Sequence, residues 1–168
     1  LRPSAVWRDA KGWRGFLGKW NDVASLSSDR KTGDNTDGNG FNPFITNIGD
    51  TSLIALNSSV RNTVYYDRSS RTWSMDHTFQ NDRGKSLLLN GYESRLRESH
   101  LVHVRWNTTS QWTLEVEAAT GRNASTSNLL AGRTYSIQEQ SAAPKLTWQP
   151  NARMRGTAQF KYTEKRNA

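Results

Sequence analysis

A regular alternation of apolar and polar residues runs from Thr51 to Asn167, broken at intervals by turns. Its first segment sets one series against another: Ile54, Leu56, Val60, Val64 and Tyr66 against Leu53, Asn57, Arg61 and Thr63. Successive side chains of a β-strand point to opposite faces, so a period of two predicts a sheet with two different sides. The predicted fold class is therefore all-β.

Later segments repeat the pattern, and turns of two lengths separate them. Short polar turns are predicted at 67–70, 107–110 and 149–151, and each directly follows an aromatic residue: Tyr66, Trp106 or Trp148. Longer polar connections are predicted at 81–85 and 121–132. Between Ile137 and Leu146 the apolar parity changes and Pro144 removes an N–H, which predicts a bulge or an edge strand. The arrangement predicted is an antiparallel β-meander whose short and long connections alternate.

Composition limits the ways in which such a sheet can be covered. Hydrophobic residues make up 34% of the chain and the mean hydropathy is −0.83, while apolar mass is concentrated in 7 Trp, 5 Tyr and 5 Phe. No window approaches the roughly 18 apolar residues of a membrane-spanning helix. Each alternating segment is, however, about long enough to cross a bilayer as a tilted strand. The +8 charge is spread along the chain, and cysteine is absent, which excludes disulfides and thiolate chemistry.

The first forty residues are predicted to form a separate lead-in segment, followed by the meander over 41–168. Residues 1–40 are rich in aromatics and glycine, and Gly12, Gly15 and Gly18 argue against a helix here. We predict an irregular segment, a first strand over about 17–28 and a polar loop over 33–40. That loop offers Asp34, Asn35, Asp37 and Asn39 as oxygen ligands, but it lacks the EF-hand glutamate and flanking helices. A solvated loop is preferred to a calcium site.

Several short stretches carry a resemblance to a known group of proteins. They are 41–44 (FNPF), 54–62 (IALNSSVRN), 105–107 (RWN), 144–150 (PKLTWQP) and 160–167 (FKYTEKRN). The region 41–167 resembles the C-terminal barrel region of very large, mostly uncharacterised outer-membrane β-barrel proteins of Bacteroidota-type bacteria. These are similar in style to gliding-motility and secretion barrels.

The resemblance and the alternation together predict a non-enzymatic segment of an up-and-down β-barrel in the bacterial outer membrane, related to a pore, transport or secretion. Six or seven strands fall below the eight that close the smallest such barrel, so the segment is predicted to be part of a larger one. The expected partners are the lipid bilayer and the remaining strands of the barrel, or partner membrane proteins. No nucleic acid and no cofactor are expected.

The parity of the strands divides their residues into two predicted surfaces. The expected lipid-facing residues are Ile54, Leu56, Val60, Val64, Trp73, Met75, Phe79, Val102, Val104, Trp106, Trp112, Leu114, Val116, Phe160 and Tyr162. The expected lumen-lining residues are Arg61, Asp76, Arg95, Arg97, Arg105, Glu115, Glu117, Arg155 and Lys161. Antiparallel pairing is expected to set the arginines at 95, 97 or 105 near the two glutamates.

Catalytic and metal sites are not predicted. The sequence has no G-x-S-x-G elbow, and His100 and His103 have opposite parity. With His77, these histidines are too few and too scattered for a metal. Glu115 and Glu117 share a face, as glycosidase carboxylates do, but arginine partners would keep both ionised.

Two alternatives to the barrel remain. A soluble all-β module could bind glycans on exposed Trp and Tyr. Binding of nucleic acid is less favoured, because the aromatic side chains and the arginines occupy opposite faces.

Overall fold

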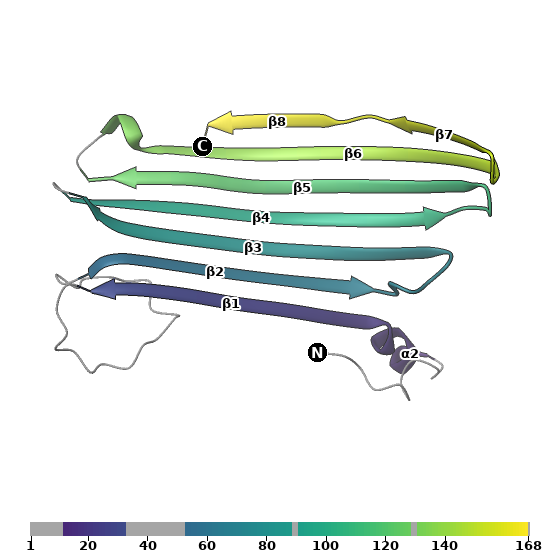
Figure 1. Cartoon of the computed structure of the whole chain (residues 1–168), viewed down its shortest axis with the longest axis horizontal. Helices are drawn as coiled ribbons and strands as arrows, with labels where there is room; N and C mark the ends of the chain where they lie inside the picture. Colours follow the sequence, from purple (N-terminus) through teal and green to yellow (C-terminus); the bar gives the residue numbers. More distant parts are fainter. Residues whose placement is uncertain (1–11, 33–52, 89–90, 129–130, 168) are drawn as a thin grey trace.

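The computed structural model describes residues 12–32, 53–88, 91–128 and 131–167. They form one antiparallel sheet of eight strands in the order β1 to β7, with β8 paired to β6 beside β7. The strands follow the chain from one edge of the sheet to the other (Figure 1). Their bounds are β1 Trp20–Thr32, β2 Leu53–Tyr66, β3 Trp73–Leu88, β4 Gly91–Asn107, β5 Trp112–Ser127, β6 Tyr135–Asn151, β7 Met154–Gln159 and β8 Tyr162–Asn167. The predicted all-β meander is confirmed.

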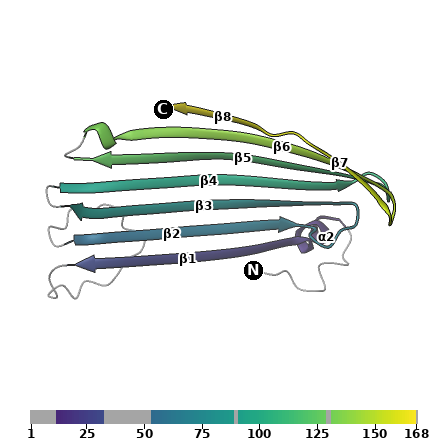
Figure 2. The ribbon, with the colours of Figure 1, turned by 45° about the horizontal axis from the view of Figure 1, so that its top comes forward.

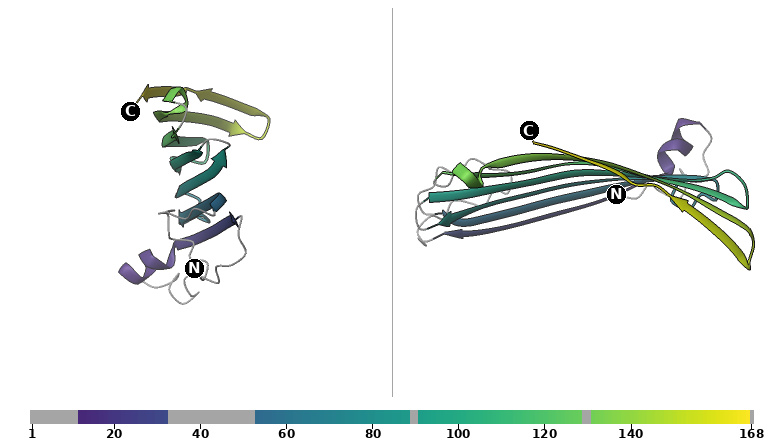
Figure 3. Two further views of the ribbon diagram at one scale, coloured as in Figure 1. Left: turned by 90° about the vertical axis from the view of Figure 1, so that its left-hand side faces the viewer. Right: turned by 90° about the horizontal axis from the view of Figure 1, so that it is seen from above.

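The sheet is a single twisted layer. Oblique, end-on and overhead views show the long strands lying side by side, with none of the described strands stacked over another (Figures 2 and 3). The edge strands β1 and β7/β8 do not pair with each other, so the described sheet is open. Tyr66 is the only large hydrophobic residue of the described part that is buried. The side chains of this sheet therefore lack the second apolar layer that ordinarily covers a β-sheet.

Two long polar connections were predicted wrongly. Residues 81–85 lie inside β3, and β5 continues to Ser127. Only two residues separate β3 from β4, so short and long connections do not alternate as expected. These stretches lack apolar alternation because they extend the sheet where both of its faces are polar. Backbone pairing with neighbouring strands, which leaves little trace in a single sequence, keeps them extended.

The segment before β1 also differs from the prediction. A six-residue helix, α2, spans Trp13–Gly18, and β1 begins at Trp20. Gly12 starts the helix with φ of 75°, a backbone conformation that glycine adopts without penalty. The ring of Phe16 lies 5.1 Å from that of Tyr66 and supports the helix from outside. Packing thus outweighs the low helix propensity of three glycines. Within the described residues, no helix is long and apolar enough to cross a membrane.

Pro144 affects the edge of the sheet rather than β6 itself. The register between β5 and β6 is unbroken from Trp112–Trp148 to Ser125–Tyr135, so the bulge is absent. The carbonyl of Pro144 accepts a hydrogen bond from Phe160 N at 3.0 Å, so its nitrogen also points towards the edge strand. There the missing N–H coincides with the break between β7 and β8.

Candidate functional surfaces

The sheet has two chemically different faces, which the strand register defines. One face carries Trp20, Trp73, Trp106, Trp112 and Trp148, and we call it the tryptophan face. The opposite face is called the polar face. We call the end with the turns 67–72, 108–111 and 152–153 the tryptophan end, and the opposite end the distal end. The helix α2 also lies at the tryptophan end (Figure 1).

The parity prediction agrees with the register. Seven of the nine residues predicted to line a lumen pair across the polar face: Arg61, Asp76, Arg95, Arg97, Arg105, Glu115 and Glu117. Arg155 lies in β7 and shares the parity of Thr157, which also faces this side. Lys161 lies in the break between β7 and β8, outside any strand. The predicted lipid-facing residues alternate onto the tryptophan face, except Phe160, which is in the same break, and Ile54, which lies at a register shift between β1 and β2.

Charge pairing on the polar face differs from the expected arginine ladder. Arg105 is opposite Glu115 in the register, as predicted, but the 2.6 Å ion pair of Glu115 is with Lys145 on β6. Arg105 instead donates to the carbonyl of Ser70 at 3.0 Å. Arg95 pairs with Glu93 of its own strand at 3.0 Å. The partner of Glu115 comes from β6, on the other side of β5 from Arg105. The parity of residues within one strand cannot specify such a partner.

The three histidines do not gather around the acidic pair, although His103 is opposite Glu117 in the register. The ion pair with Lys145 favours the carboxylate form of Glu115, whereas a general acid must carry a proton. His103 contacts Asp76 at 3.1 Å on the polar face, while His77 and His100 lie on the tryptophan face. Among the described residues, no group of three metal-ligating side chains converges.

An apolar band covers the tryptophan face of β2 to β6 in the half nearest the tryptophan end, while β1 carries Asp22 on the same face, opposite Val64. We define it as the first four tryptophan-face positions of each of β2 to β6, such as Trp73, Met75, His77 and Phe79 on β3. None of these twenty positions is Asp, Glu, Lys or Arg. From first to fourth position, the band is about 20 Å long along each strand. Farther on, the same face carries Arg83, Lys85, Glu98 and Arg122.

The polar side chains inside the band are hydrogen-bonded. Asn62 donates to Asp22 of β1 at 2.9 Å. His77 Nε2 and His100 Nδ1 lie 3.3 Å apart, while the ring centroids are 5.5 Å apart. The two ring planes are 14° apart, and the nitrogens are at hydrogen-bonding distance. Satisfied polar groups cost much less in an apolar environment than unpaired ones.

Large aromatic side chains at the tryptophan end remain accessible. Trp73, Trp106, Trp112 and Trp148 are between 37% and 50% exposed. Trp112 and Trp148 face each other across β5 and β6, with ring centroids 6.0 Å apart. In proteins generally, contiguous exposed apolar surfaces are typical of contacts with membranes, other proteins or ligands.

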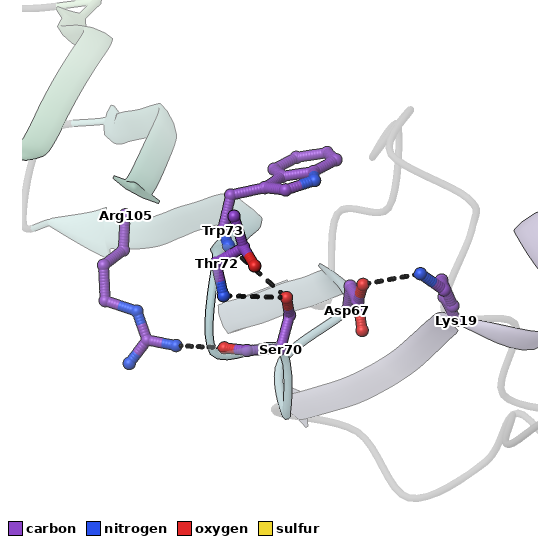
Figure 4. A network of polar contacts seen from close by, with 6 residues as sticks. All are labelled: Lys19, Asp67, Ser70, Thr72, Trp73 and Arg105. Carbon is purple, nitrogen blue, oxygen red and sulfur yellow. Dashed lines mark hydrogen bonds and ion pairs between the residues drawn. The ribbon is translucent and has the colours of Figure 1, made fainter. Parts of the chain in front are cut away.

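A polar network orders the turn between β2 and β3 at this end (Figure 4). Ser70 Oγ accepts hydrogen bonds from the backbone N–H groups of Thr72 and Trp73 at 3.2 and 3.4 Å. Asp67 has φ of 48° and forms an ion pair with Lys19 at 2.8 Å. The hydrogen bond from Lys19 to Asp67 raises the pKa of the Lys19 ammonium above its usual value. The network ties the turn to the start of β1.

Replacing Asp67 by asparagine tests this pair without disturbing the turn, because asparagine tolerates positive φ. Lys19 has a raised pKa when folded, so its contribution is complete below its unfolded pKa of about 10.4 and is lost as pH rises through the folded pKa. We expect Asp67→Asn to lower the melting temperature at pH 8 and to have a smaller effect at pH 11. Thermal unfolding of the wild type, Asp67→Asn and Lys19→Gln measures this. An equal effect at both pH values would contradict the assignment.

The polar face also has a hollow in its distal half, which sequence reasoning missed. Its volume is about 580 Å³, and it is lined by residues of β1 to β6 that include Arg95 and Arg97. The alternation assigned both arginines to this face, but the depth of the surface depends on the sizes of neighbouring side chains on other strands. Gly84 was the available signal, since a glycine inside a strand leaves room above the sheet.

Comparisons with protein-family models, with curated proteins and with solved structures found no match for this chain.

Proposed function

We propose that this chain is a non-enzymatic segment of the wall of a β-barrel in the bacterial outer membrane. The tryptophan face then contacts lipid and the polar face lines the lumen of a pore, transport or secretion barrel. The observation that carries the proposal is a single-layer sheet with an apolar band, free of acidic and basic residues, on one face only. Such a face needs an apolar covering, which among the described elements only α2 provides, and only over Tyr66.

Three further features support this placement. The band is about 20 Å long along the strands, close to the roughly 25 Å apolar height of outer-membrane barrels. Exposed tryptophans gather at one end of the band, where a bilayer interface favours amphipathic rings. The open edges at β1 and β7/β8 carry unpaired backbone groups that further barrel strands would pair.

The four exposed tryptophans of the apolar band provide a direct test. We expect the chain to fold in vesicles, and lipids brominated near the headgroup to quench tryptophan fluorescence more than lipids brominated at the chain end. The physical reason is the position of Trp73, Trp106, Trp112 and Trp148 at one boundary of the band. Circular dichroism in the same samples verifies the strand content.

A parallel sample in buffer without lipid or detergent distinguishes the rival soluble module. A compact monomer with buried tryptophan fluorescence in plain buffer, unchanged on adding vesicles, would reject the membrane assignment. An aggregated or unfolded chain in buffer that gains strand structure with vesicles supports it.

A further inference from the structure

The hollow on the polar face has the size and the lining of a small-molecule site. Its volume of about 580 Å³ lies within the range of roughly 300–1,000 Å³ typical of ligand pockets. It lies beyond the apolar band, where both faces of the sheet are polar. A ligand there would meet side chains from six strands without displacing any described element.

The absence of a side chain at Gly84 leaves the centre of the hollow open. Gly84 is paired with Asn57 on one side and with Arg95 on the other, so a side chain at this position would project into the hollow. A Cβ there would approach Asn57 Oδ1 to 3.2 Å, a tight contact with a side-chain atom. Substitution at Gly84 therefore fills the space with little demand on the backbone.

Two charged groups around this opening, Asp82 and Arg95, already have partners within the chain, whereas Arg97 has none among the described residues. Asp82 accepts hydrogen bonds from Ser59 Oγ at 2.6 Å and from Gln80 Nε2 at 2.7 Å, and Arg95 is held by Glu93. Arg97, between Asp82 and Asn123 in the register, makes no hydrogen bond or ion pair to any described residue. Its guanidinium is therefore available to a ligand.

The remaining lining includes hydroxyl, amide and aromatic groups, together with the carboxylate of Asp29 on β1 and the guanidinium of Arg83 on β3. Ser27, Ser59, Asn57 and Asn123 offer donors and acceptors, and Tyr135 adds a ring that is 51% exposed. A ligand rich in hydroxyls matches the hydroxyl and amide side chains, and the apolar face of a sugar ring matches the ring of Tyr135. A carboxylate matches Arg97, because guanidinium groups bind carboxylates through paired, charge-assisted hydrogen bonds.

We propose that the hollow binds a short acidic oligosaccharide, with its carboxylate on Arg97 and a sugar ring against Tyr135. The proposal depends on the polar face alone and holds whether lipid or protein covers the tryptophan face.

Calorimetric titration of the full chain, folded in neutral detergent, with a trisaccharide of uronic acids tests this proposal. We expect saturable binding at least about tenfold tighter than that of a neutral trisaccharide, the factor that one charge-assisted hydrogen bond provides. Arg97→Gln should remove this preference, and Gly84→Val should abolish binding of both sugars. Arg61→Gln on the same face outside the hollow, and Gly156→Val on the tryptophan face, are matched controls that should leave binding unchanged.

Other outcomes overturn the inference. Absence of binding, equal binding of the neutral and acidic sugars, or unchanged binding by a folded Gly84→Val variant each rejects it. Displacement of the sugar by inorganic phosphate at the same concentration also rejects it, because that result shows a simple anion site. If Gly84→Val does not fold, Tyr135→Ala replaces it: weaker binding of both sugars supports the site, and unchanged binding rejects it.

Discussion

Replacement of Tyr66 by alanine is expected to lower the free energy of unfolding by about 3–5 kcal/mol. Tyr66 is only 7% exposed, and its ring lies 5.1 Å from Phe16, 5.4 Å from Trp20 and 4.9 Å from Trp73. Truncation removes the centre of this cluster and leaves a cavity among three aromatic rings. Denaturant unfolding followed by circular dichroism measures the loss, and hydrogen exchange at α2 is expected to accelerate.

Tyr65→Ala is the matched control for this prediction. Tyr65 is the preceding residue of β2 but faces the polar side, where its ring contacts the Arg68 guanidinium at 4.8 Å. We expect a loss of about 1 kcal/mol, as for a partly exposed cation–π contact. Equal losses for the two variants would show that the aromatic cluster has no special role in stability.

Arginine at Val102 is expected to destabilise the folded chain in lipid vesicles by about 2–4 kcal/mol, the cost of a charge on the lipid face of a barrel. Val102 lies within the apolar band, between His77 of β3 and Ala118 of β5. The introduced guanidinium would meet apolar surroundings and would have no acidic residue of the band to pair with. Urea titration of vesicle-bound protein, followed by tryptophan fluorescence, gives the difference.

The neighbouring residue supplies the control. Leu101 is on the same strand but faces the polar side, opposite Thr78 and Ala119. Leu101→Arg is expected to cost less than about 1 kcal/mol, because its charge can remain solvated. If the two arginines cost the same in vesicles, the two faces do not have different environments and the proposed orientation fails.

Strand identity was predictable wherever the two faces differ. Over Leu56–Tyr66, Trp73–Phe79 and Trp112–Ala118, the alternation assigns both the strand and the face of each residue. The prediction failed at 81–85 and 121–127, where both faces are polar and no alternation exists to read. The predicted polar loop over 33–40, with its weighed calcium ligands, lies outside the described residues.

The partners of individual side chains were less predictable than their faces. Parity set Arg105 opposite Glu115, but only the position of β6 brought Lys145 to that carboxylate. Likewise, His77 and His100 are 23 residues apart and meet because β3 and β4 pair in one particular register.

The sequence by itself determined that this chain forms an antiparallel sheet with two chemically distinct sides, because a period of two is a local property of a strand. The tertiary structure decided that the sheet is a single open layer, that the apolar band covers only half of one face, and that Gly84 opens a hollow on the other. These features depend on which residues of different strands become neighbours. That information belongs to the pairing register, which no single strand contains.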